Sequence, residues 1–218
     1  MAAGSDRVRV RRAPQKGRYD RASIDAVLDR GLFGHVAFAV GADVYCIPML
    51  YARVGDSVYL HGSTASRAMR TLSGGAAACL TVTIIDGLVL ARSVFQHSAN
   101  YESVIVFGRF TPVGDKEERL AALEAFTDKL LPGRWSEVRG PSPQELSVTT
   151  ILALPISEAS VKRRSGPPDD DETADAAIDT WAGVVPLVTS FGAPIASPGL
   201  RPGIPLSPSV VQLLADAD

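Results

Sequence analysis

Apolar residues follow two different periods along the chain, and each period predicts a type of element. Apolar stripes at helical spacing predict helices over 20–30 and 115–131, and a short helix is expected to begin near residue 67. Apolar runs rich in β-branched residues predict β-strands over 34–40, 43–54, 57–61, 76–85, 88–95, 101–113 and 147–161. Glycine-containing turns are expected to join neighbouring runs at 41–42, 55–56 and 86–87.

These elements predict a mostly β fold with flanking helices, of the α+β class. The first six strands, with one short helix inserted among them, are enough for a closed or nearly closed barrel. Pro48 lies inside the strand over 43–54 and has no N–H to donate, so that strand is expected at an edge or a bulge. Backbone left unpaired there either faces a ligand or belongs to a plain edge strand.

A turn of small and hydroxyl residues follows the third strand. Ser63, Thr64 and Ser66 each carry a side chain that can cap a helix, and Arg67 comes directly after them. Free amides, hydroxyls and a guanidinium at one helix start form an anion site that is best suited to a phosphate. The alternative is an ordinary capped helix whose arginine is solvated.

Composition narrows the class of protein. Of 218 residues, 46% are hydrophobic and 21% charged, so most of the chain can bury a core. The formal net charge of -2 argues against nucleic acid as the main partner. No apolar run approaches the roughly 20 residues of a membrane span and no secretory signal is visible, so we expect a cytoplasmic protein. Cys46 and Cys79 form no metal pattern and are expected to be buried thiols, with a disulfide or redox pair as the alternative.

Four regions are expected along the chain. Residues 1–17 carry several basic side chains and little that is apolar, which predicts a flexible basic arm. The barrel domain is expected over 18–165, and a solvated linker over 166–179. The tail over 180–218 is rich in Pro and Gly but also carries Trp181 and other large apolar residues, so we expect it to be extended and packed on the barrel or on a second subunit.

The order of these motifs resembles the pyridoxamine 5′-phosphate oxidase-like family, in particular its flavin-nucleotide-binding branch and the nitroimidazole-resistance proteins. The matching segments, which all lie within residues 18–191, are RASIDAVLDRGLFGHVAF, IPMLYA, YLHGSTASRAMRTL, HSANYESVIVFGRF, the acidic-start helix and WAGVVPL. The resemblance implies the FMN-binding split β-barrel fold and a homodimer with FMN at the subunit interface. It also places the FMN phosphate at the turn after the third strand.

The resemblance further indicates which residues hold the cofactor. The expected cofactor-binding residues are Pro48, Met49, Leu50, His61, Gly62, Ser63, Thr64, Ser66, Arg67 and Asn100. His61 either donates to a phosphate or flavin oxygen or has a structural role. His97, in the polar break before the sixth strand, is the candidate catalytic residue, because an imidazole there can bind a substrate or deliver a proton. No set of metal ligands is expected.

Two classes of function follow from the resemblance. The first is an FMN-dependent oxidoreductase that reduces or oxidises a small organic substrate at the flavin. The second is a flavin-binding protein without turnover, which serves as a carrier, sensor or regulator. Haem binding through His61 or His97, or deazaflavin binding, is a third alternative. The sequence carries no glycine fingerprint of a dinucleotide-binding domain, so a nicotinamide donor would bind transiently over the flavin.

Overall fold

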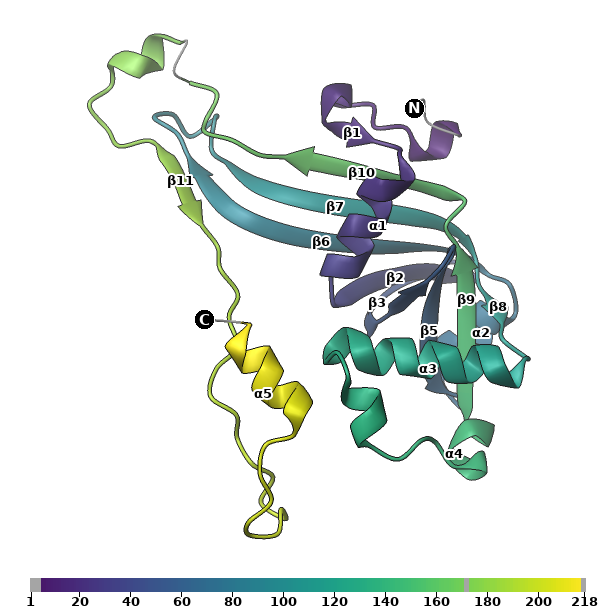
Figure 1. Cartoon of the computed structure of the whole chain (residues 1–218). Helices are drawn as coiled ribbons and strands as arrows, with labels where there is room; N and C mark the ends of the chain where they lie inside the picture. Colours follow the sequence, from purple (N-terminus) through teal and green to yellow (C-terminus); the bar gives the residue numbers. More distant parts are fainter. Residues whose placement is uncertain (1–4, 171–172, 217–218) are drawn as a thin grey trace.

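The computed structural model describes residues 5–170 and 173–216. The remaining positions, which belong to the predicted arm, linker and tail, lie outside the described residues. Figure 1 shows two antiparallel sheets that meet near the helices α2 and α3. A long strand pair projects from the larger sheet, and the C-terminal segment returns from its far end toward α3.

The larger sheet supplies the projecting strands. It has seven strands, in the order β1 (Gly17–Arg18), β10 (Glu158–Arg164), β7 (Ser98–Arg109), β6 (Ala77–Leu90), β2 (Phe33–Val40) and β3 (Asp43–Leu50), with β11 (Gly183–Pro186) paired on β6. The smaller sheet has four, in the order β4 (Ala52–Val54), β5 (Ser57–Ser63), β9 (Thr149–Pro155) and β8 (Thr111–Pro112). Strand β3 lies at an edge, which confirms the expectation drawn from Pro48.

Helices begin and end where local signals predict. The α-helices are α1 (Arg21–Arg30), α2 (Arg67–Ser73), α3 (Lys116–Leu130), α4 (Pro143–Ser147) and α5 (Pro208–Ala215). Short 3-10 turns are η1 (Asp6–Val8), η2 (Pro14–Lys16), η3 (Arg134–Glu137) and η4 (Ala174–Ala177). Asp20 caps α1 by accepting from the Ser23 N–H at 2.8 Å, and Asp115 caps α3 in the same way. Gly31 follows α1 directly, as predicted.

Strand β5 separates two apolar clusters. Val58 and Leu60 are fully buried in the main core, which α1 and α2 close. Tyr59 lies on the opposite face of β5, in a second cluster under α3 that includes Phe126. The two faces of one strand therefore serve two different environments.

Two predicted strands each divide between the sheets. The run over 43–54 breaks at Tyr51, whose buried hydroxyl lies 2.6 Å from the carbonyl of Leu28 and 2.8 Å from that of Gly31. The run over 147–161 breaks at a turn over 156–157, directly after Pro155. In both cases the chain crosses from one sheet to the other, which the continuous apolar pattern does not reveal.

The hairpin turn predicted at 86–87 is wrong. Strand β6 continues through Gly87 to Leu90, with only a register shift between Ile85 and Gly87, and the chain reverses over 91–97 instead. A Cβ on Gly87 would lie 3.0 Å from Val184 of β11, so the glycine allows β11 to approach β6 closely.

Two predictions of burial also need correction. Cys46 is exposed and Cys79 only partly buried, because both lie on sheet faces that this chain leaves open, and neither forms a disulfide. In α3, the predicted buried stripe is covered only in part, since Phe126 is buried whereas Leu130 is 52% exposed. The uncovered side of that stripe lines a cavity described below.

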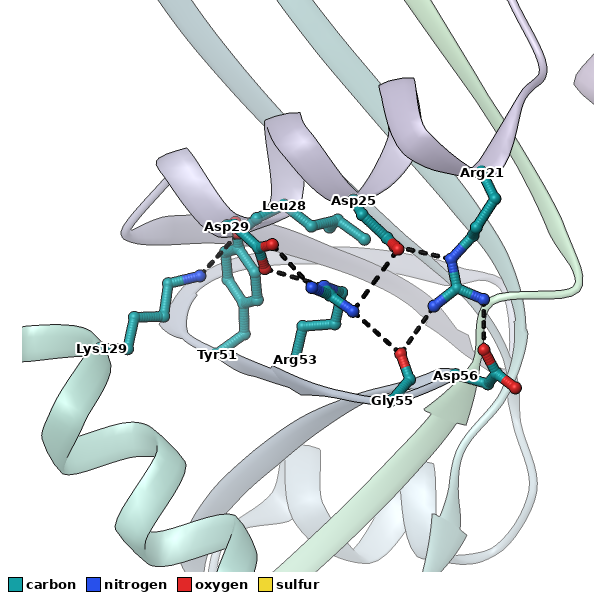
Figure 2. Close-up of polar contacts among 9 residues, drawn as sticks. All are labelled: Arg21, Asp25, Leu28, Asp29, Tyr51, Arg53, Gly55, Asp56 and Lys129. Atoms are coloured by element: carbon teal, nitrogen blue, oxygen red, sulfur yellow. Dashed lines mark hydrogen bonds and ion pairs between the residues drawn. The ribbon is translucent and has the colours of Figure 1, made fainter.

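A polar network fixes α1 against the β4–β5 hairpin and α3 (Figure 2). Arg53 pairs with Asp29 at 2.6 and 2.8 Å, and Arg21 contacts Asp25 at 2.6 Å and the Gly55 carbonyl at 2.6 Å. From α3, the Lys129 ammonium donates to the Leu28 carbonyl at 2.7 Å and lies 3.6 Å from the centre of the Tyr51 ring. The position of α3 is therefore tied to the end of α1.

The segments predicted as arm, linker and tail have definite positions where the structure describes them. In the arm, Val8 is buried and Gly17 pairs with Lys162 of β10. In the linker, the Asp170 carboxylate is buried and accepts from the Arg92 backbone N–H at 2.6 Å. The tail runs extended from β11 to α5 (Figure 1). Within the described part of the chain, no helix has the length and apolar character needed to cross a membrane.

Candidate functional site

The first candidate site, which we call the turn site, lies where β5 leads into α2. Ser66 caps α2 by accepting from the Met69 N–H at 3.5 Å, and Ser63 accepts from the Ala65 N–H at 3.2 Å. Both hydroxyl protons remain available to a ligand. Thr64 is exposed beside them, and its backbone N–H donates to the Val148 carbonyl at 3.0 Å.

Arg67 brings the positive charge of the turn site to the edge strand. Its guanidinium lies 4.3 Å from the centre of the Tyr45 ring, and Tyr45 belongs to β3. Among the described residues no carboxylate pairs with Arg67, so its hydrogen-bond donors are free for an anion. Pro48 is exposed on the same strand, with Met49 and Leu50 next to it and half-buried. Arg67 of the turn therefore reaches the edge strand at Tyr45, whereas Pro48 lies three residues further along that strand and on its opposite face.

Gly62 has a packing role at this site. A Cβ at this position would lie 2.9 Å from Cγ of Met69, so the absence of a side chain lets α2 approach β5. This contact fixes the start of α2, and with it Arg67, relative to the strand.

The second candidate site is an apolar cavity of about 570 Å³ between β5 and α3, which we call the His61 cavity. His61 contacts Phe126 edge to face, with ring centres 4.3 Å apart. The cavity walls are mostly apolar, formed by Leu123, Phe126, Leu130, Leu131, Trp135, Val138 and Pro141. Arg134 and Arg139 add positive charge, although each also pairs with a glutamate, at 3.1 Å and 2.6 Å respectively.

His61 is chemically unusual in this setting. Its Nδ1 is buried and has no hydrogen-bond partner among the described residues. Burial lowers the pKa of the imidazole, so the ring is neutral at pH 7. A buried polar atom without a partner is costly, and in native proteins it often indicates a missing ligand. The neutral imidazole is also the form that binds metals.

His97 and Asn100 lie elsewhere. Nδ1 of His97 accepts from the Ala91 N–H at 2.9 Å, and Oδ1 of Asn100 accepts from Arg164 at 2.7 Å. Asn100 lies nine positions before Arg109 on β7, which is roughly 30 Å at about 3.3 Å per residue. Arg109 in turn bonds to the Gly75 carbonyl just after α2. Within one chain, therefore, the structure does not bring His97 and Asn100 to the turn site.

Sequence reasoning missed the wall of the His61 cavity. The apolar stripe over 115–131 predicts a helix, but such a stripe looks the same whether it covers a core or lines a cavity. The sequence therefore does not distinguish the cavity-lining role of Leu130 from burial. Trp135, just after α3, carries no local signal that marks it as a cavity residue.

The two antiparallel sheets and flanking helices define a split-barrel protein. The family model described as pyridoxamine 5′-phosphate oxidase matches residues 20–163, which is most of the chain. The chain therefore belongs to the pyridoxamine 5′-phosphate oxidase family, as the order of its sequence motifs indicated. No curated protein matches it.

Solved structures provide further likenesses. The flavocytochrome Anf3 from Azotobacter vinelandii is 36% identical, with 98% of this chain and 99% of that chain covered and a TM-score of 0.91. The FAD and heme binding protein from Mycobacterium smegmatis is 41% identical, with 91% of this chain and 97% of that chain covered and a TM-score of 0.86. A protein from Bacteroides thetaiotaomicron that is named for 5-nitroimidazole antibiotic resistance is 18% identical, with 67% of this chain and 85% of that chain covered and a TM-score of 0.57. At this identity the likeness shows only a common fold.

Proposed function

We propose that this protein is a redox protein that binds a flavin and also haem. The observation that carries the proposal is its likeness, over nearly the whole chain, to two solved structures whose names specify a flavocytochrome and an FAD- and haem-binding protein. Both are more than 30% identical to this chain, so the likeness extends beyond the fold. The turn site and the His61 cavity offer two separate places for the two groups.

The turn site fits the phosphate of a flavin nucleotide. An unpaired guanidinium at Arg67 and exposed hydroxyls at Ser63 and Thr64 are the donors that a phosphate prefers. The Tyr45 ring of the neighbouring edge strand β3 lies beside the guanidinium and offers an aromatic surface for the flat ring system. A bound flavin supplies the redox chemistry, and the protein supplies binding and orientation. The phosphate is common to FMN and FAD, so this argument holds for either flavin.

The His61 cavity fits haem. Haem iron is commonly held by one histidine, and His61 presents a neutral imidazole within apolar walls. The volume of about 570 Å³ lies within the usual range of cofactor pockets, roughly 300–1,000 Å³. Arg134 and Arg139 lie at the wall, where a carboxylate of the macrocycle would compete with their glutamate partners Glu137 and Glu145. A bound haem supplies one-electron chemistry. His97 is exposed, and its Nδ1 already accepts a backbone hydrogen bond.

We also propose a homodimer that completes the flavin site. The tail is anchored at both ends, because β11 pairs with β6 and the α5 residue Ser209 bonds to Glu137. Between these anchors the tail exposes large apolar residues, among them Val188 at 85%, Phe191 at 58% and Ile195 at 95%. A second copy seated against this tail would cover them. Sedimentation at micromolar concentration should give a dimer, and a monomer that holds flavin would contradict this proposal.

Absorption of the purified protein tests the central proposal. We expect a flavin spectrum together with a Soret band. His61→Gly should lose the Soret band and keep the flavin, and added imidazole should restore haem binding. His97→Gly is the matched control and should keep both groups. A Soret band unchanged in His61→Gly would show that haem, where bound, is held elsewhere.

The role of the bound groups is a separate question. We propose electron transfer to or from a small organic substrate as the principal activity, with carriage or sensing without turnover as the alternative. Oxidation of NADH or NADPH in the presence of added acceptors separates the two. Turnover would support the oxidoreductase, and its absence with a range of acceptors would favour the carrier.

A further inference from the structure

A third cavity lies away from both candidate sites, between the N-terminal arm, α1 and β10. Its volume is about 530 Å³. Three small residues of α1 line one side, namely Ala22, Ser23 and Ala26, and Val161 of β10 contributes to the opposite side. The small side chains of α1 leave room beside the sheet that larger ones would fill. We call this space the arm cavity.

The arm cavity carries an excess of positive charge. Lys16, Arg18 and Arg163 line it, and the acidic residue among its lining is Glu102. Glu102 is already paired, with Arg163 at 3.1 Å and with Arg30 at 3.2 Å. Arg164 also lines the cavity, but its guanidinium donates to Asn100 and to the carbonyls of Gly166 and Pro167.

Two of the cations have no carboxylate partner among the described residues. Arg18 donates to the carbonyls of Gln15 and Gly17, both at 2.8 Å, which orient the guanidinium without neutralising it. No ion pair is formed by Lys16 with any described carboxylate. Two uncompensated cations beside one cavity, of which Arg18 is oriented by hydrogen bonds, favour an anion with more than one negative charge.

The arm is held in place by backbone pairing. Gly17 pairs with Lys162, and Arg18 with Val161, so β1 forms the edge of the larger sheet. The Arg7 guanidinium further along the arm lies 4.7 Å from the centre of the Phe107 ring, which adds a second anchor. The backbone that carries Lys16 and Arg18 is therefore held in place before any ligand arrives, which reduces the entropy cost of binding.

We propose that the arm cavity binds the diphosphate of a nucleotide. The two positive charges of Lys16 and Arg18 are matched by a ligand with at least two negative charges. The cavity volume of about 530 Å³ is larger than a single phosphate group would fill. The hydroxyls of Ser23 and Ser165 add donors for phosphate or ribose oxygens. A free nucleotide that carries a diphosphate, such as ADP or NADH, has this chemistry. FAD is not a source, because its diphosphate contains the flavin phosphate that we place at the turn site. The proposal does not depend on haem or flavin binding at the other two sites.

Calorimetric titration with ADP at low ionic strength tests the proposal, with adenosine as the uncharged comparison. We expect ADP to bind and adenosine to give no detectable heat. The double variant Lys16→Gln/Arg18→Gln should weaken ADP binding on the order of tenfold for each cation removed. Arg201→Gln, which removes an exposed arginine from the tail, is the matched control and should leave the affinity unchanged. Far-UV circular dichroism should show that both variants are folded.

Competition with NADH extends the test to a dinucleotide. We expect NADH to displace ADP, because both carry a diphosphate. The proposal is overturned if ADP does not bind, or if the double variant binds ADP as tightly as the unmodified protein does. The titration reads neither flavin nor haem absorption, so its failure is distinguishable from failure of the proposed cofactors.

Discussion

Replacement of Tyr51 by phenylalanine removes one oxygen atom from the junction of the two sheets. Tyr51 is 1% exposed, and its hydroxyl donates toward the carbonyls of Leu28 and Gly31. Burial raises the pKa of this phenol well above its ordinary value, so it is a hydrogen-bond donor at every relevant pH. The change to phenylalanine keeps the ring and its contact with Lys129.

The size of the effect follows from what each carbonyl retains. The Leu28 carbonyl keeps the Lys129 ammonium at 2.7 Å, whereas the buried Gly31 has no second donor for its carbonyl among the described residues. One buried acceptor is thus left without a partner, which costs about 1–3 kcal/mol of unfolding free energy. For a protein of this size, that corresponds to a fall in Tm of roughly 2–12 °C.

Thermal and urea unfolding at one fixed protein concentration measure this loss. Tyr45→Phe is the matched control, because the same atom is removed from a ring at the open edge strand, where no described residue accepts from it. We expect the control to lie within about 0.5 kcal/mol of the unmodified protein. If Tyr51→Phe is as stable as Tyr45→Phe, the hydroxyl does not hold the end of α1, and the reasoning about this junction fails.

Three further predictions concern charged groups. Burial lowers the pKa of Lys129 from 10.5 to about 8, so between these pH values the unfolded state binds more protons than the folded state. The free energy of unfolding should therefore rise as pH increases from 8 to 10.5. Lys129→Met should abolish this pH dependence, and the control Lys116→Met should keep it. Hydrogen bonds from Ser209 lower the pKa of Glu137 from 4.5 to about 2, so the contact between Glu137 and α5 stabilises the fold above pH 4.5 and is lost as pH falls toward 2. Hydrogen exchange should show the amides of α5 losing protection over this pH range. In Glu137→Gln the same amides should already be unprotected at pH 7. Arg67→Ala should weaken FMN binding by about 1.5–3 kcal/mol, with riboflavin and Arg70→Ala as insensitive comparisons.

Local signals predicted much of the fold. The helices over 20–30 and 115–131 and the edge position of Pro48 each depend on a few neighbouring residues, and all three are found close to where the sequence predicts them. The breaks at Tyr51 and after Pro155 were missed because they depend on distant partners. Tyr51 leaves its strand to reach carbonyls of α1, which no window of local sequence contains.

The candidate site was predictable to a similar extent. The turn residues and Arg67 form one stretch of chain, so their proximity follows from the sequence alone. The cavity beside His61 requires Phe126, which lies on a helix far along the chain, and only the tertiary fold brings the two rings to 4.3 Å. Asn100 lies near the start of the long strand β7, far from the end of that strand that approaches α2. The sequence pattern predicts the strand but not which of its ends lies near the turn, so this separation could not be predicted.

The alternation of side chains along β5 explains how one strand serves two sites. Leu60 faces the main core, while His61 faces α3 and its cavity. Gly62 then lets Met69 of α2 approach, and Arg67 begins α2 six residues after His61. If both proposed groups bind as argued, a single packed segment connects the imidazole to the guanidinium. The position of β5 against α3 then determines the geometry of the His61 cavity, so a change that removes the anchor of α3, such as Lys129→Met, should alter the Soret band more than the flavin spectrum.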